Sequence, residues 1–89
     1  MNEIIDQKLL NKILNIFKEH IDDEPDEEHG GFYLWKYMDE NKKNVRHLLY
    51  LVNEGFCKVL YQKSSEGNIY FAAPMKLTNK GIHYLSNIK

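Results

Sequence analysis

The chain has 89 residues, of which 43% are hydrophobic and 28% are charged, and its formal net charge is −1 at pH 7. A chain of this length can bury one core, and this composition is typical of a globular domain rather than a disordered segment. These features exclude a second domain, so we expect a single domain over residues 1–89.

The sequence gives no sign of a membrane protein. No run approaches the roughly 20 apolar residues that span a bilayer, and the first residues lack the basic and apolar blocks of a signal peptide. We therefore expect a cytoplasmic protein without a membrane partner. Cys57 is the only cysteine. It cannot form an internal disulfide, and we expect it to be a small buried hydrophobe.

The near-neutral charge hides two halves of opposite sign. Residues 1–31 contain nine acids and three bases, a net charge of −6, whereas residues 32–89 contain nine bases and four acids, a net charge of +5. Such an asymmetry allows a phosphate-binding surface on the C-terminal part although the overall charge is close to zero.

The first expected element is a helix over residues 3–21. Its apolar residues recur at spacings of three and four, as on one face of a helix. The stripe is wider than the usual ~100°, so we expect part of it to face a second copy of the chain in a homodimer. The stripe consists of Ile5, Leu9, Leu10, Ile13, Leu14, Ile16, Phe17 and Ile21.

An acidic loop is expected over residues 22–31. Its like charges repel one another, Pro25 has no backbone donor, and two glycines follow. The acids, with His20 and His29, are conceivable metal ligands, but their order lacks the Asp/Asn alternation of a calcium loop. We therefore expect a solvated loop, with no metal and no cofactor.

Residues 32–38, FYLWKYM, fit two structures. Tyr33, Trp35 and Tyr37 alternate as on a strand, whereas Phe32 and Met38 share a possible helical face with Trp35. The density of aromatic residues favours a short strand that is followed by a turn.

Residues 39–56 predict an amphipathic helix, with Asp39 as the N-terminal cap and Gly55 in the left-handed conformation that ends it. The residues expected to face inward are Val45, Leu48, Leu49 and Val52. Those expected to face outward are Lys43, His47, Tyr50 and Glu54.

A β-hairpin and a last helix complete the chain. Residues 57–62 and 69–73 are β-rich, and the turn formers of residues 63–68 separate them. Pro74, which lacks a ladder donor, is expected to end the second strand, and Thr78 is expected to cap the last helix. That helix contains Ile82, Tyr84, Leu85 and Ile88.

A set of residues in the segment 53–85 forms a recognisable pattern: Glu54, Gly55, Phe56, Tyr61, Tyr70, Pro74, Leu77, Thr78, Lys80, Gly81, Tyr84 and Leu85. With them the segment resembles the corresponding part of the YjcQ-like winged-helix proteins of bacteria and phages. A His eight residues before a Gly, here His47 and Gly55, also resembles related small winged-helix families. The resemblance implies an α+β winged helix-turn-helix fold with three to four helices and a small antiparallel sheet, of three strands in the family, that includes a hairpin wing. The family has no established enzymatic activity.

A winged helix suggests binding of double-stranded DNA, with residues 39–56 as the recognition helix. In such proteins the start of this helix reads base edges while cations hold phosphates. Asn44 has the chemistry to pair with adenine and Arg46 with guanine, and Lys63 on the hairpin can hold a phosphate. The candidate DNA-binding residues are Lys42, Lys43, Asn44, Arg46, His47, Tyr50 and Lys63.

Two other interpretations remain open. Polar residues on a helix face can simply be solvent-exposed residues of a core helix. Alternatively, the domain binds a protein partner, as a phage-related adaptor, through the wide stripe of the first helix and the acidic loop. The sequence contains no Gly-rich phosphate loop, zinc-ligand spacing or nucleophile motif, so we do not expect an enzyme.

Overall fold

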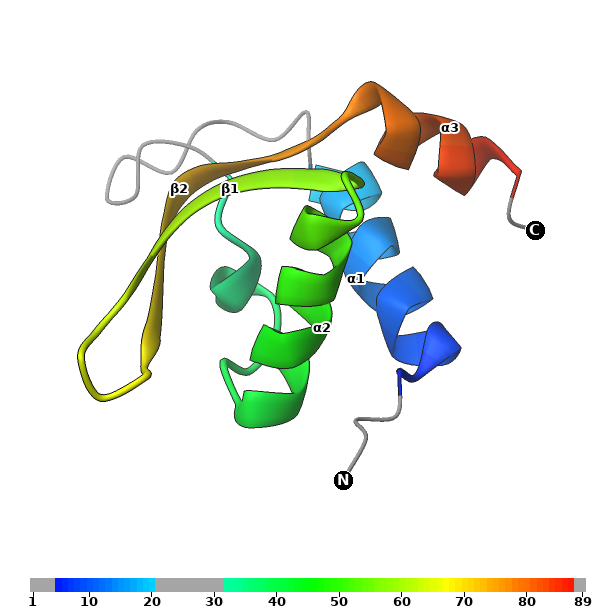
Figure 1. Cartoon of the computed structure of the whole chain (residues 1–89). Coiled ribbons are helices and arrows are strands. Elements are labelled where there is room, and N and C mark those ends of the chain that lie inside the picture. Colours follow the sequence, from blue (N-terminus) through cyan, green and yellow to red (C-terminus); the bar gives the residue numbers. More distant parts are fainter. Residues whose placement is uncertain (1–4, 21–31, 88–89) are drawn as a thin grey trace.

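A computed structural model of the chain describes residues 5–20 and 32–87, and within them the fold is α+β (Figure 1). The expected acidic loop, residues 22–31, lies outside the described residues. None of the helices in the described ranges has the length and apolar character needed to cross a membrane. The elements are α1 (Gln7–His20), the 3-10 helix η1 (Leu34–Lys36), α2 (Lys42–Asn53), β1 (Cys57–Lys63), β2 (Ile69–Leu77) and α3 (Asn79–Ser86).

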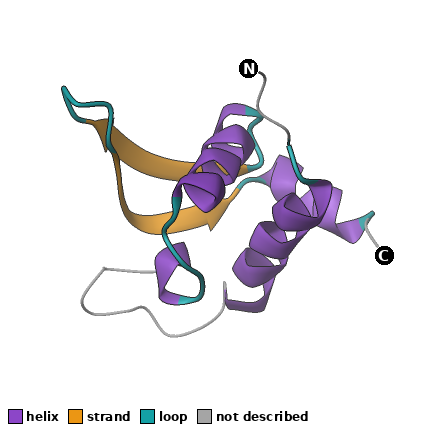
Figure 2. Ribbon diagram, turned by 90° about the horizontal axis from the view of Figure 1, so that it is seen from below, coloured by secondary structure: helices purple, strands orange, loops and turns teal. Residues whose placement is uncertain are grey.

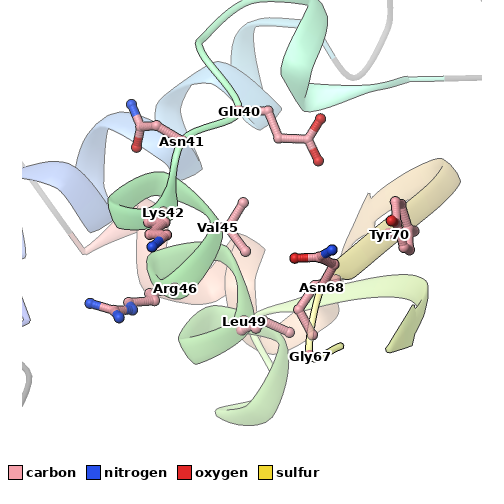
Figure 3. Close-up of a pocket in the computed structure, with 10 residues that line it drawn as sticks. Glu40, Asn41, Lys42, Val45, Arg46, Leu49, Gly67, Asn68 and Tyr70 are labelled. Carbon is pink, nitrogen blue, oxygen red and sulfur yellow. The ribbon is translucent and has the colours of Figure 1, made fainter. Parts of the chain in front are cut away.

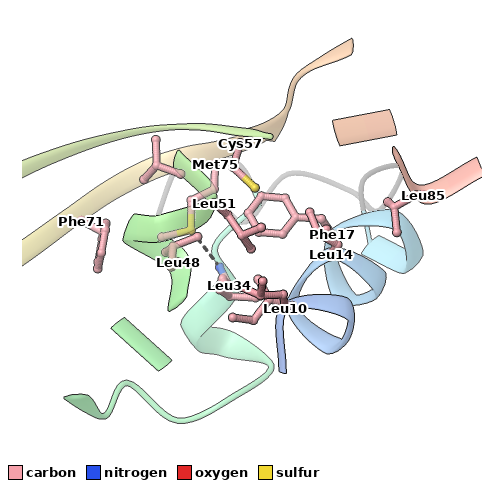
Figure 4. Packing of buried hydrophobic residues seen from close by; sticks show 12 residues of the cluster. Leu10, Leu14, Phe17, Leu34, Leu48, Leu51, Cys57, Phe71, Met75 and Leu85 are labelled. Atoms are coloured by element: carbon pink, nitrogen blue, oxygen red, sulfur yellow. Dashed lines mark hydrogen bonds between the residues drawn. The ribbon is translucent and has the colours of Figure 1, made fainter. Parts of the chain in front are cut away.

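The core lies where α1, η1, α2 and the hairpin meet (Figure 4). Leu34 of η1 is fully buried at its centre, and its backbone N–H donates to the sulfur of Met75 over 3.3 Å. Cys57 is buried here as expected. The buried hydrophobic residues are Leu10, Ile13, Leu14, Phe17, Leu34, Leu48, Leu51, Cys57, Val59, Phe71, Met75 and Leu85.

The apolar stripe of α1 is covered by its own chain. Leu10, Ile13, Leu14 and Phe17 are buried, and α1 contacts α2, α3, η1 and β2. The other stripe residues in the described part of the chain also pack against the core: Ile5, Leu9 and Ile16. Because the domain itself uses the whole described width of the stripe, α1 gives no support to the expected dimer.

Residues 32–38 do not form the expected strand. The carbonyl of Phe32 accepts one hydrogen bond from the backbone N–H of Met75 in β2, over 2.9 Å, and the chain then turns into η1. This turn carries Leu34 into the core and sets Trp35 against Phe71, with ring centroids 5.8 Å apart. Contacts with distant residues thus override the local β preference of this segment.

Helix α2 begins later than expected. Its N-terminal cap is Asn41, whose side-chain oxygen accepts from the backbone N–H of Asn44 over 2.8 Å, so Asp39 is not the cap. At the other end Gly55 has φ +84°, which confirms the expected left-handed residue. The backbone N–H of Phe56 reaches back to the carbonyl of Leu51 over 2.9 Å and closes the helix end.

The two strands form an antiparallel hairpin, as expected, but β2 continues to Leu77. Pro74 therefore does not end it. Two residues of β1, Lys58 and Leu60, pair with Lys76 and Ala72, so the register is irregular where Pro74 lies. An irregularity of this kind lets a residue without an N–H lie within a strand.

Helix α3 starts at the predicted cap. The hydroxyl of Thr78 accepts from the backbone N–H of Gly81 over 3.1 Å. Two views show α3 at the far end of the hairpin from its turn, close to α1 (Figures 1 and 2). The order of elements is compatible with a winged helix. The sheet of the described residues has two strands, and Phe32 adds only its single hydrogen bond to β2.

Candidate nucleic-acid interface

A groove of about 550 Å³ lies between the first half of α2 and the turn of the hairpin (Figure 3). We call it the helix–hairpin groove. Its apolar lining comes from Val45 and Leu49 of α2 and from Ile69 of β2, all of which are half-buried. Its polar lining residues are Glu40, Asn41, Lys42, Arg46, Asn68 and Tyr70.

Two of the predicted DNA-binding residues, Lys42 and Arg46, lie at this groove and are exposed. Figure 3 shows Arg46 extending from α2 away from the hairpin residues, while Val45 and Leu49 point towards them. The cations therefore flank the groove on the outer side of the helix, and the space between helix and hairpin is lined mainly by apolar and neutral polar groups.

Asn44 and His47 are not available to read bases. Asn44 is 9% exposed, and its side-chain amide donates to the carbonyl of Asp39 over 2.8 Å. His47 is 3% exposed. Both side chains are therefore parts of the folded domain, which corrects the prediction that they face DNA.

The ring of His47 joins two helices. Its Nε2 accepts from the backbone N–H of Asp6, just before α1, over 3.0 Å. Its Nδ1 lies 2.6 Å from the carbonyl of Lys43, which can only accept, so these partners fit an imidazole with its proton on Nδ1. The polarity of His47 predicts an outward position, because the sequence does not show that backbone groups of the folded chain can bind the ring.

Lys43 is exposed, but its ammonium lies 3.7 Å from the carboxylate of Asp6. Desolvation raises the pKa of Asp6, but hydrogen bonds from the backbone N–H groups of Leu9 and Lys8 and the charge of Lys43 outweigh it, so the pKa is below its ordinary value. Asp6 thus caps α1 and also places a negative charge beside the start of α2. Lys43 is consequently less suited to hold a phosphate than Lys42.

The last two predicted residues lie apart from the groove lining. Tyr50 is half-buried at a second cavity, of about 170 Å³, which Tyr84 of α3 and Glu54 also line. Lys63 is exposed at the end of β1, where it pairs with Ile69 beside the hairpin turn. Of the seven predicted residues, the structure therefore brings only Lys42 and Arg46 to the groove, with Lys63 nearby.

Two other kinds of site, a cysteine nucleophile and a metal centre, find little support in the described residues. Burial raises the pKa of the Cys57 thiol to about 12, so this group is protonated at neutral pH and is a poor nucleophile. No group of three or more potential metal-ligating side chains comes together within residues 5–20 and 32–87.

Several groove residues were not predicted from sequence. Asn68 and Tyr70 belong to the hairpin, whose turn brings them opposite α2, and Val45 and Leu49 were assigned to the core. The apolar face of α2 is in fact turned so that Leu48 and Leu51 are its fully buried residues. The sequence carries no signal for these positions, because the exposure of Tyr70 and the meeting of hairpin and helix follow from how distant segments pack.

Comparison with known proteins gives no match: no family model, no curated protein and no solved structure is similar to the chain.

Proposed function

We propose that the chain is a winged-helix DNA-binding protein with a transcription-related, non-enzymatic role, related to the YjcQ-like proteins. In this assignment α2 is the recognition helix and the β1–β2 hairpin is the wing. The observation that carries the proposal is the position of Lys42 and Arg46, exposed at the start of α2 and beside a groove that the hairpin turn closes on its other side.

The charge distribution supports this proposal. Residues 32–89 carry a net charge of +5, and one of their bases, Lys63, is exposed beside the hairpin turn. Phosphate contacts supply much of the affinity of proteins for DNA, and they require such a basic surface. With Asn44 and His47 buried, we expect affinity from phosphate contacts and only modest base selectivity from Arg46.

The proposal is tested by titrating labelled duplex DNA at 50 and 200 mM salt. Affinity should fall steeply with salt because counterions are released when phosphates are neutralised. The Lys42→Glu/Arg46→Glu variant should lose binding at both concentrations. These positions are better targets than Lys43, since a glutamate there would also face Asp6.

The matched control is Lys12→Glu/Lys18→Glu, which makes the same change in net charge at exposed positions of α1. It should retain most of the affinity. If wild-type protein does not bind duplex at 50 mM salt, or if the two double variants lose affinity equally, duplex recognition by this surface is wrong.

The second candidate function is protein interaction, and a specific surface favours it. Leu60 is 69% exposed on the outer face of the hairpin, opposite the exposed Ala72, with Lys58 and Lys76 nearby. Because α1 is covered, this surface is where we place the homodimer or protein partner expected from the sequence. Sedimentation should then show a concentration-dependent dimer that Leu60→Lys abolishes. A monomer at all concentrations would remove the homodimer.

A further inference from the structure

We propose that the helix–hairpin groove binds one unstacked base of a single-stranded nucleic acid, while Lys42 and Arg46 hold the neighbouring phosphates. This inference rests on the proposed function only in taking a nucleic acid as the ligand. It adds a site, a binding mode and a base preference to it.

The shape of the groove favours a single base. The groove is concave and has a volume of about 550 Å³, within the roughly 300–1,000 Å³ of pockets that bind small organic groups. A base that is stacked and paired in a duplex cannot enter such a space, whereas a base that is splayed out of a strand can. The outer surface of α2 is the part that suits a duplex, and the groove is a separate feature beside it.

The chemistry of the two walls also favours a base. Val45 and Leu49 offer an apolar surface on the helix side, and Tyr70 lines the hairpin side, where Figure 3 shows its ring edge-on. Tyr70 is 58% exposed, and its hydroxyl has no hydrogen-bond partner among the described residues. Stacking of bases on exposed aromatic rings is the common way in which proteins hold single strands.

Polar groups at the groove can meet the edge of a base. The backbone of Asn68 is used within the turn, because its N–H donates to the hydroxyl of Ser64 and its carbonyl accepts from the Ser64 N–H. Its side-chain amide has no partner within the described part of the chain and reaches towards the helix (Figure 3). It can donate one hydrogen bond to a base and accept another.

Glu40 lies at one end of the groove, where its carboxylate can only accept hydrogen bonds. A carboxylate is unfavourable beside a phosphate but suits a base edge that carries adjacent donors. Guanine presents an N–H and an amino group side by side on its pairing edge, whereas thymine presents one N–H between two carbonyls. The groove should therefore prefer guanine to thymine.

The test measures binding of two labelled single-stranded pentanucleotides, dTTGTT and dTTTTT, at low salt by fluorescence anisotropy. Wild-type protein should bind dTTGTT at least threefold more tightly. Tyr70→Ala should weaken this binding about tenfold, as expected for the loss of one stacked base. Tyr70→Phe, which keeps the ring, should bind like wild type, and Glu40→Gln should lose the preference for guanine.

The matched control is Tyr61→Ala, since Tyr61 is also an exposed hairpin tyrosine, at 42%, but does not line the groove. It should leave pentanucleotide affinity unchanged. Thermal unfolding of each variant confirms folding, and NMR chemical-shift changes should appear at Val45, Asn68 and Tyr70 when dTTGTT is added.

The outcomes separate this inference from duplex recognition. Duplex binding without pentanucleotide binding leaves the proposed function intact and overturns the groove site. Pentanucleotide binding that depends on Tyr70, without duplex binding, supports the groove site and overturns duplex recognition. Equal losses of pentanucleotide affinity in Tyr70→Ala and Tyr61→Ala would also overturn the groove site. So would NMR shifts of groove residues that appear with an acidic peptide but not with dTTGTT.

Discussion

The two ends of α2 are fixed to the rest of the domain in different ways. At its start, the side chains of Asn44 and His47 make the contacts, by binding backbone groups of Asp39 and Asp6. At its end, backbone carbonyls that follow the helix make the contacts: the carbonyl of Gly55 accepts from the Thr78 hydroxyl, and the carbonyl of Phe56 accepts from the Thr78 N–H over 3.1 Å.

The difference matters because the start of α2 also borders the proposed binding surface. Polar residues there serve either the fold or a ligand, and only the contacts in the folded domain show which: Asn44 binds the Asp39 carbonyl and His47 binds the Asp6 N–H. At the end of α2 the roles follow from local sequence preferences. Gly55 adopts the left-handed conformation that ends a helix, and Thr78 caps the helix that follows it. Substitutions at the two ends of α2 should therefore differ in their effect on stability.

The largest effect is expected for Gly81→Ala at the backbone junction. An added Cβ would lie 2.2 Å from the carbonyl oxygen of Phe56, so the backbone of α3 or of residue 56 must move. We expect a loss of about 3 kcal/mol in the free energy of unfolding, measured by urea titration. Ile82→Ala, at an exposed neighbouring position of α3, should change it far less, and equal losses would show that the close approach is unimportant.

His47→Leu tests the side-chain junction. The substitution leaves the Asp6 N–H without its acceptor in a half-buried position, so we expect a loss of about 2 kcal/mol in unfolding free energy. His83→Leu makes the same replacement at an exposed position of α3 and should stay within about 0.5 kcal/mol of wild type. If His47→Leu is equally mild, the ring does not hold α1 to α2.

Asn41→Ala tests which residue caps α2. Losing the side-chain acceptor for the Asn44 N–H should lower the unfolding free energy by about 1 kcal/mol. Asp39→Ala, at the position that the sequence suggested, should have little effect because Asp39 contributes its backbone carbonyl to Asn44. A larger loss of unfolding free energy for Asp39→Ala than for Asn41→Ala would show that Asp39 is the cap.

The smallest effect concerns acid pH at the start of α1. The pKa of the Asp6 carboxyl is lower in the folded chain than its ordinary value of 3.8. Its contribution to stability is therefore present above pH 3.8 and is lost as the pH falls through the lower, folded value. Asp6→Asn should be slightly less stable than wild type at pH 6. The difference between their urea midpoints should be smaller at pH 3 than at pH 6. A constant gap would exclude this linkage.

Much of the fold was predictable because it depends on local patterns. The helices, the hairpin, Gly55 and Thr78 follow from residue spacing and from turn and cap preferences. The aromatic residues of 32–38 favour a strand locally, whereas the folded chain forms a 3-10 helix there that places Leu34 in the core. Pro74 lies inside β2 because the register is irregular beside it, and the sequence of one strand does not show its register with another.

The candidate site divides in the same way. The helix, the hairpin and the cations Lys42, Arg46 and Lys63 can be predicted from charge and periodicity, which are properties of the chain. The inward position of His47 and Asn44, and the place of Tyr70 and Asn68 at a groove beside α2, follow from the packing of the folded domain. The physical reason is that burial and concavity depend on which distant segments pack together, and a linear pattern does not contain that information.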